Sequence, residues 1–346
     1  IRRPPSSRPK PSSAASDVYK RQNIHEAFQN LPDGKYVWTS EQTGFRHLYG
    51  LDLISREINQ ITTGDWQIDS FEGFSKDTNE LFFTATKDSE LEKHLYRINK
   101  EGVIDPISLN RPGIHNVKIN CDQNVYIDVN HALSQQPRVE LRNLKTDELI
   151  KDISPDQDVR IEQFGLTPPK LLKIPHEKSE YLNSAVFYPD ENEFGPGPYP
   201  TVVYVYGGPH VQLVTDSWSL TANLRLQYLK DQGFLVAVVD NHGSNRRGVS
   251  FESSIKNKLG EIEVNDQKLM LDWLIDQGLT DDKRVGVFGW SYGGYMTLMC
   301  MAKYPELFRV GAAGAPVVNW QLYDTCLLYT SDAAGEGVGV DLGGRR

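Results

Sequence analysis

Near residue 200 the sequence changes from one hydrophobic pattern to another. Up to about residue 160 it consists of short aromatic or alternating runs separated by turn formers such as Pro32-Asp33-Gly34 and Thr63-Gly64-Asp65, which is typical of an all-β fold. From Thr201 onward, continuous apolar runs alternate with stretches of helical period. Continuous apolar strands between helices indicate a parallel sheet covered on both faces. The 346 residues are therefore expected to form an all-β unit followed by an α/β unit.

The all-β half is expected to contain strands at 35–40, 47–51, 80–86, 94–99 and 124–130. Strands at intervals of about 8–12 residues are found in sandwiches, barrels and propeller blades. At about 45 residues for each four-stranded blade, residues 23–160 would form about three blades. No repeat is visible in the sequence, so this pattern by itself leaves a sandwich open.

The α/β half is expected to occupy residues 161–325. Strands are predicted at 201–206, 235–240, 285–288 and 310–313, and helices at 222–232, 264–277 and 293–303. Residues 151–200 are rich in Pro, Asp and Glu, which indicates a linker, although 182–188 has the pattern of a strand.

Composition excludes several classes of protein. No apolar run approaches 18 residues, which argues against a membrane-spanning helix. A net charge of −9 disfavours a nucleic-acid partner, because phosphate binding needs clustered Lys and Arg. The three cysteines, Cys121, Cys300 and Cys326, have neither metal-ligand spacing nor the number for a disulfide framework. We therefore expect no metal and no cofactor. The compartment is left open between periplasm and cytoplasm.

The two ends of the chain differ from the rest and are related to each other. A DNA that encodes residues 13–22 reads, on its opposite strand, as residues 326–334. The two end segments therefore resemble a DNA-sequencing adapter that has been translated as protein. Residues 1–22 and 326–346 are therefore expected to be non-native, and the stretch between them to be a fragment of a longer protein. The ends carry charges of +5 and −1, which leaves −13 on residues 23–325.

The strongest chemical signal is Gly289-Trp290-Ser291-Tyr292-Gly293, a G-x-S-x-G between a predicted strand and a predicted helix. Glycines on both sides let the backbone turn sharply, so that the serine hydroxyl stands exposed above the sheet. The N–H of the next residue then points at the oxyanion that forms during acyl transfer. This context favours a nucleophilic serine over a serine in a tight packing turn.

The sequence resembles the prolyl oligopeptidase family of serine peptidases, with the dipeptidyl peptidase IV branch and its bacterial members fitting best. The resemblance rests on G-W-S-Y-G-G-Y-M-T (289–297), Y-V-Y-G-G-P-H (204–210) and A-G-A-P-V-V-N-W-Q-L-Y-D (313–324). Further matches are S-E-Q-T-G-F-R-H-L-Y (40–49), T-K-D-S-E-L-E-K-H-L-Y (86–96) and L-G-E-I-E-V-N-D-Q (259–267). It implies part of a β-propeller, the C-terminal blades, followed by the N-terminal part of an α/β-hydrolase fold.

The resemblance also implies roles for individual residues. Ser291 would be the nucleophile, and the Tyr206 hydroxyl and the Tyr292 amide would form the oxyanion hole. An apolar pocket for the residue before the scissile bond would be lined by the Tyr292 ring and three further side chains, Val317, Trp320 and Tyr323. From the residues alone, these aromatic side chains belong at least as often to the core, and a strand-end tyrosine such as Tyr206 is often simply buried.

Two features of the family are missing, and one position departs from it. All eight histidines precede Ser291, whereas this fold orders its triad as Ser, Asp, His, so the catalytic Asp and His are expected beyond residue 325. The adjacent Glu pair that holds a substrate ammonium in the family is also absent. His242 stands where relatives usually carry Arg, and Arg246-Arg247 behind it is expected to be a solvated loop pair.

Four functions remain open. The first is a serine exopeptidase that releases N-terminal dipeptides, Xaa-Pro or Xaa-Ala, from peptides and polypeptides through an acyl-enzyme; the fragment alone would be inactive. The others are an acylaminoacyl peptidase or oligopeptidase of the same fold, a carboxylesterase, and a non-catalytic binding module. The resemblance is also compatible with a homodimer of the full-length protein.

Overall fold

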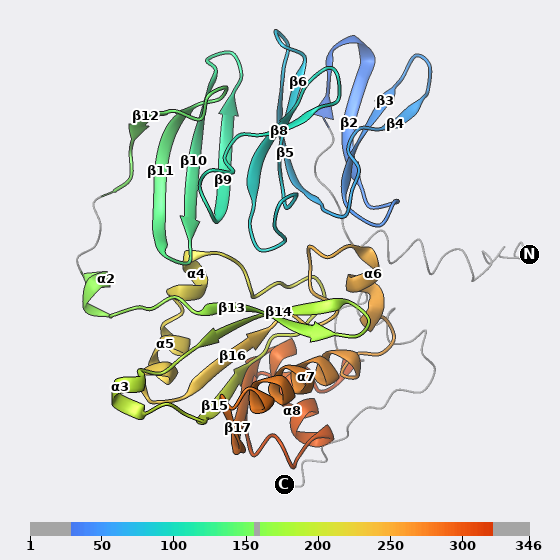
Figure 1. Cartoon of the computed structure of the whole chain (residues 1–346). Helices are drawn as coiled ribbons and strands as arrows, with labels where there is room; N and C mark the ends of the chain where they lie inside the picture. Colours follow the sequence, from blue (N-terminus) through green and yellow to red (C-terminus); the bar gives the residue numbers. More distant parts are fainter. Residues whose placement is uncertain (1–28, 156–159, 321–346) are drawn as a thin grey trace, which may run out of the picture.

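The computed structural model describes residues 29–155 and 160–320, and Figure 1 shows them as a row of β-sheets above an α/β sheet. Three antiparallel sheets of four strands come first along the chain, followed by one sheet of six strands. The two adapter-like ends and Tyr323 lie outside the described residues.

The three small sheets match the predicted blades in number and position. The first contains β1 (Gln29–Asn30), β2 (Lys35–Ser40), β3 (His47–Asp52) and β4 (Ile58–Gln60), with the 3₁₀ turn η1 (Pro32–Gly34) between β1 and β2. The second contains β5 (Ile68–Ser75), β6 (Glu80–Ala85), β7 (His94–Ile98) and β8 (Ile104–Pro106). The third contains β9 (Ile114–Asn120), β10 (Val125–Ala132), β11 (Gln135–Asn143) and β12 (Leu149–Asp152). All five predicted strands are present, with ends within two residues of the prediction.

The middle blade decides between a sandwich and a propeller. Successive side chains of a strand point to opposite faces, and in β6 Phe83 packs with Val37 of the first blade while Phe82 packs with Val117 of the third. The middle sheet is thus covered by another sheet on each face, which a two-sheet sandwich does not allow. The expected partial β-propeller is confirmed.

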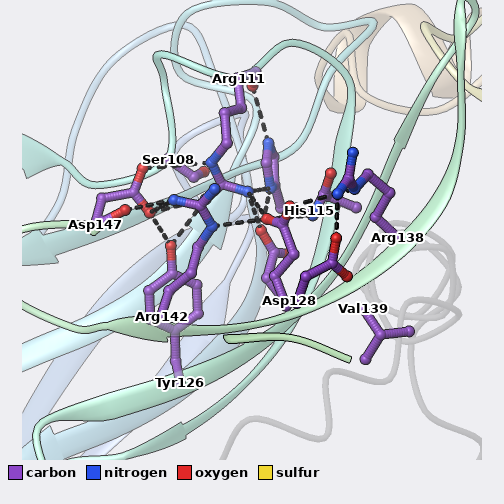
Figure 2. Close-up of polar contacts among 12 residues, drawn as sticks. Ser108, Arg111, His115, Tyr126, Asp128, Arg138, Val139, Arg142 and Asp147 are labelled. Atoms are coloured by element: carbon purple, nitrogen blue, oxygen red, sulfur yellow. Dashed lines mark hydrogen bonds and ion pairs between the residues drawn. The ribbon is translucent and has the colours of Figure 1, made fainter. Parts of the chain in front are cut away.

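The third blade contains a network of buried charges around Arg111 (Figure 2). The Arg111 guanidinium donates to Asp128 at 2.6 Å, to Asp147 at 2.9 Å and to the Tyr126 hydroxyl at 2.8 Å. The His115 ring contacts the same Asp128 oxygen at 2.7 Å. Burial acts to raise the pKa of Asp128, but the bonds from His115 and Arg111 outweigh it and hold that pKa below its usual range. The network therefore keeps Asp128 ionised inside the blade.

The α/β part is built on a sheet with the order β13-β14-β16-β15-β17-β18. Its strands are β13 (Lys170–His176), β14 (Glu180–Phe187), β15 (Tyr199–Tyr204), β16 (Leu235–Val239), β17 (Thr280–Trp290) and β18 (Val310–Gly314). The helices are α2 (Arg160–Gln163), α3 (Glu191–Phe194), α4 (Trp218–Thr221), α5 (Leu224–Asp231), α6 (Val249–Glu252), the 3₁₀ turn η2 (Ser253–Ile255), α7 (Ile262–Asp276) and α8 (Tyr292–Lys303). Within the described residues, none of these helices is long and apolar enough to cross a membrane.

The central strand β16 is buried at every position, because helices cover both faces of the sheet. Ala237 packs with Leu271 of α7 and Met296 of α8, whereas Val238 packs with Leu226 of α5 on the opposite face. This two-faced burial explains the continuous apolar run from which the strand was predicted.

Two expectations about the α/β part need correction. Residues 151–200 are not simply a linker, because β13 and β14 within them are the first two strands of the large sheet. The sheet is also mixed: β15, β16, β17 and β18 run parallel as predicted, but β14 pairs antiparallel with β13 and β16. An antiparallel pair with one buried face has a mixed pattern of polar and apolar residues, which in β13 resembles a linker.

The expectation of a solvated Arg246-Arg247 pair was wrong. Arg246 forms an ion pair with Asp69 of the second blade at 2.8 Å, with only 15% of its side chain exposed. Arg247 donates to the Tyr181 carbonyl at 2.6 Å and lies over the Tyr181 and Phe251 rings. Both arginines hold the loop after β16 in place, one of them against the propeller.

Candidate active site

Ser291 lies at a sharp turn between a strand and a helix. Strand β17 ends at Trp290, α8 begins at Tyr292, and Ser291 between them has φ 58° and ψ −117°. A positive φ costs a non-glycine residue of order 1–2 kcal/mol, so the surrounding structure must hold this conformation. The predicted strand–turn–helix context of Gly289–Gly293 is present.

Glycine is required on both sides of the turn. A Cβ atom on Gly289 or on Gly293 would overlap the carbonyl oxygen of Val205 in the chain that follows β15. A Cβ on Gly294 would lie 2.6 Å from the Gly314 oxygen. The turn therefore packs between the chain that follows β15 and the end of β18; β15 and β18 are the two neighbours of β17 in the sheet.

The same packing brings Tyr206 to the turn. The position of a Cβ on Gly293 lies 3.1 Å from the Tyr206 Cα, and the Tyr206 and Tyr292 rings are 6.2 Å apart. Tyr292 is the first residue of α8, where main-chain N–H groups have no acceptor inside the helix. The Ser291 N–H is already bonded to the Gly314 oxygen at 2.9 Å. The Tyr292 N–H thus belongs to the unpaired positive end of the helix beside the serine.

Aromatic rings form a wall next to the turn. The Trp320 ring lies 5.7 Å from Tyr292 and 5.2 Å from Tyr295, and Val317 is half-buried nearby in the chain. Of the four predicted pocket residues, the structure brings Tyr292 and Trp320 together; Tyr323 is not described.

Glu263 of α7 was not predicted from the sequence. Its side chain is fully buried, and it accepts a hydrogen bond from the Tyr292 hydroxyl at 2.6 Å. Burial raises the pKa of Glu263 and that of Tyr292. The only sequence signal was the position of Glu263 within G-E-I-E-V-N-D-Q, which by itself says nothing of its partner. Its contact fixes the direction of the Tyr292 ring, which lies next to the serine.

The described residues bring no base to the serine. Within residues 29–155 and 160–320, no hydrogen bond reaches the Ser291 hydroxyl. The His210 ring contacts Glu252 at 3.0 Å, and the His242 ring contacts Asp266 at 2.8 Å. Neither contact is of the Ser–His type that activates a nucleophile.

Asp240, at the carboxyl end of β16, is buried and accepts the N–H groups of Leu213 and Val214 at 2.8 and 3.1 Å. Burial raises its pKa from 3.8 to about 7, although the two N–H bonds lower it. Asp240 therefore ties the chain that follows β15 to the end of β16 through a carboxyl group that titrates near neutral pH.

We expect the stability of the chain to depend on pH through Asp240. The folded state holds the Asp240 proton more tightly than the unfolded state does. The stability that protonated Asp240 contributes is therefore complete below about pH 4 and is lost as pH rises to about 7. Between pH 5 and 7 the free energy of unfolding of the wild type should fall by about 2 kcal/mol more than that of Asp240→Asn. Urea unfolding at several pH values measures both proteins, and parallel curves would contradict the prediction.

Comparison with known proteins identifies the family. A family described as "Prolyl oligopeptidase family" matches residues 218–341, and the "Dipeptidyl peptidase IV (DPP IV) N-terminal region" matches residues 11–137. The chain belongs to the prolyl oligopeptidase family, in its dipeptidyl peptidase IV branch. The expected family and its partial β-propeller followed by the start of an α/β-hydrolase domain are both confirmed.

Individual members of the family are similar over most of this chain. Human dipeptidyl peptidase 8 is 31% identical over 350 residues, which cover 88% of this chain and 38% of that protein. The crystal structure of Porphyromonas gingivalis dipeptidyl peptidase 4 superposes with a TM-score of 0.79 at 25% identity and covers 88% of this chain and 43% of its own. The crystal structure of a putative dipeptidyl aminopeptidase IV from Bacteroides ovatus superposes with a TM-score of 0.77 at 26% identity. The match covers 88% of this chain and 46% of that one. The chain spans about two fifths of the length of such relatives.

Proposed function

We propose that this chain carries the nucleophile of a serine peptidase that releases N-terminal dipeptides, Xaa-Pro or Xaa-Ala, through an acyl-enzyme. The observation that carries the proposal is Ser291, held at φ 58° between β17 and α8 with Tyr206 packed against the same turn. The relatives that carry the name dipeptidyl peptidase support this choice of substrate over an acylated peptide or a simple ester.

In the proposed mechanism the Ser291 oxygen attacks the carbonyl carbon of the second residue of the substrate. The proton of the hydroxyl passes to a histidine that we place, with its aspartate, in a part of the full-length protein beyond residue 325. The carbonyl oxygen becomes an oxyanion, which the Tyr292 N–H and the Tyr206 hydroxyl stabilise by hydrogen bonds. The same histidine then protonates the leaving amine, and water releases the dipeptide from Ser291.

We propose that the Tyr292 ring, Val317, Trp320 and Tyr323 receive the second residue of the substrate. Proline is compact and has no N–H when its nitrogen is acylated, so aromatic walls can enclose its ring without leaving a polar group unpaired. A bulky side chain would not fit beside Trp320. The buried bond between Tyr292 and Glu263 keeps one wall of this pocket rigid.

We expect Trp320→Ala in the full-length protein to lower kcat/KM for a Gly-Pro substrate more than for a Gly-Ala substrate. Burial of three ring methylenes at about 0.8 kcal/mol each gives proline roughly 2 kcal/mol of preference, so the ratio should fall by up to about 30-fold. Tyr206→Phe is the matched comparison: loss of one oxyanion donor should lower both rates alike, by about 10²–10³. An unchanged ratio in Trp320→Ala would assign this residue to the core.

A panel of chromogenic substrates tests the proposed function on the full-length protein. Gly-Pro-p-nitroanilide should be the preferred substrate. Preference for an N-acetylated amino acid would indicate an acylaminoacyl peptidase, preference for a fatty-acid ester would indicate a carboxylesterase, and no turnover would indicate a binding module; each contradicts the proposal.

The chain by itself should hydrolyse the same substrate far more slowly than the full-length protein. Without a base, only substrate binding and stabilisation of the oxyanion remain. These accelerate the reaction by about 10³–10⁴-fold over the uncatalysed reaction in water. Efficient, Ser291-dependent turnover by the 346-residue chain would instead make His210 or His242 a candidate base.

We further propose that residues 23–160 and 161–325 are the native parts of the two domains. Homodimerisation of the full-length protein is also a proposal, which analytical ultracentrifugation would test.

A further inference from the structure

Two histidines face one carboxylate in the α/β part, away from the contacts of Ser291. His176 is the last residue of β13, His242 follows β16, and Asp266 lies in α7. His242 Nδ1 lies 2.8 Å from Asp266 Oδ2, and His176 Nε2 lies 3.5 Å from Asp266 Oδ1. The three potential ligand atoms lie within 4.8 Å of one another. His242 and Asp266 are buried, and 12% of the His176 side chain is exposed.

These distances are close to those of a zinc shell. Zinc binds imidazole nitrogen at about 2.0–2.1 Å and carboxylate oxygen at about 2.0–2.2 Å, so that neighbouring ligand atoms in a tetrahedral shell are about 3.3 Å apart. The observed 2.8 and 3.5 Å lie on either side of this value. The three potential ligand atoms span up to 4.8 Å, so an ion could enter between the two rings and the carboxylate after side-chain shifts of about 1 Å that bring the farthest pair closer together. Two imidazoles and a carboxylate are ligands that zinc commonly takes.

The protons of the two rings can move out of the way. Each ring nitrogen that faces Asp266 acts as a donor when no metal is bound, because it faces a carboxylate. On metal binding the proton transfers to the other nitrogen of the ring. For His176 this is Nδ1, which lies 3.0 Å from the Ser179 hydroxyl and now accepts the N–H groups of Lys178 and Ser179. The hydroxyl can turn to accept the new bond, and water in the cavity that Lys178 and Ser179 line can accept the two N–H groups that lose Nδ1 as acceptor.

The surroundings of His176, His242 and Asp266 suit a metal ion that has one coordination position open to water. His176, His242 and Asp266 line a cavity of about 920 Å³, whose lining also includes Ser250 and Ser254. Water from this cavity can complete a four-coordinate shell. Phe251 stacks on the His242 ring at 4.3 Å and fixes its direction.

We propose that His176, His242 and Asp266 bind one zinc ion, with water as the fourth ligand. The ion would join β13, the loop after β16 and α7, three elements that are distant in the sequence. His242 supplies the second imidazole of the site, and arginine at this position would donate hydrogen bonds but offer no lone pair to a metal.

Titration of the metal-free chain, with any affinity tag removed, tests the proposal. Isothermal calorimetry should show one zinc per chain with a Kd of about 10 µM or tighter. Co²⁺ should give the visible absorption of a tetrahedral site, and zinc should displace it. At a hundredfold excess over Kd, zinc should raise the Tm by about 5 °C. None of these readouts involves Ser291, so they are independent of the proposed peptidase activity.

Three variants separate the site from adventitious binding. His242→Arg can pair with Asp266 and is expected to fold, but it should weaken zinc binding by about 100-fold and abolish the shift in Tm. His176→Asn should have the same effect on binding. His210→Asn is the matched control: His210 has φ 61°, which asparagine tolerates, and its loss should leave the Kd unchanged. Absence of saturable binding below about 100 µM, or equal binding by wild type and His242→Arg, would overturn the proposal.

Discussion

Replacing Ser291 with alanine in the full-length protein should lower kcat for Gly-Pro-p-nitroanilide by about 10⁶-fold, because loss of the nucleophile removes the covalent route entirely. Ser291→Gly should be equally inactive. The two variants should differ in stability: alanine retains the strain of φ 58°, whereas glycine adopts this conformation freely and should be more stable than Ser291→Ala by about 1 kcal/mol. Steady-state kinetics and thermal unfolding measure the two effects separately.

The matched control for this experiment is Ser55→Ala, which changes an exposed serine in the turn between β3 and β4. It should leave kcat within twofold of the wild type, about 0.4 kcal/mol in the barrier. If Ser291→Ala kept more than about 1% of the activity, a loss of less than about 3 kcal/mol in transition-state stabilisation, the nucleophile would have to be another residue.

Replacing Arg111 with methionine should destabilise the propeller blades by about 3–5 kcal/mol, because removal of one partner leaves buried charges uncompensated. Arg111 holds Asp128, whose side chain is fully buried, and Asp147, of which 13% is exposed. Methionine keeps much of the length and apolar volume of the arginine stem, so the loss reports the charge rather than the packing. Urea unfolding followed by far-UV circular dichroism measures the change.

Arg138→Met is the control for the same blade. Arg138, labelled in Figure 2, contacts Asp152 and lies 3.5 Å from Glu140, but 47% of its side chain is exposed. Exposed pairs are worth about 0–1 kcal/mol because solvent screens them. Equal losses from Arg111→Met and Arg138→Met would show that burial does not govern this network.

Local sequence patterns were sufficient to predict strands of the propeller and the turn at Ser291. Strands such as β2 and β6 were found because side chains of a strand alternate between two faces. Gly289 and Gly293 marked the turn, because a residue without Cβ is needed wherever two segments of backbone meet closely. Each of these signals lies within about ten residues of sequence, which is the distance over which backbone geometry alone relates side chains.

Long-range contacts were not visible in the same way. β13 was missed because its place at the edge of a mixed sheet gives it no continuous apolar run. Arg246 has the local sequence pattern of a solvated residue, because nothing near it in the sequence indicates Asp69, 177 positions away. Glu263 and Tyr292 are 29 positions apart, and only the packing of α7 against α8 joins them.

The sequence by itself determined where the chain turns, which side chains share a strand or helix face, and that Ser291 stands at a strand–helix turn. Only the tertiary structure decided which distant groups meet: Tyr206 with the turn, Glu263 with Tyr292, and His176 with His242 and Asp266. The reason is physical. Backbone sterics and hydrophobic periodicity act between neighbours in the chain, whereas the partners of a buried polar group depend on how sheets and helices pack, and burial then requires that those partners be present.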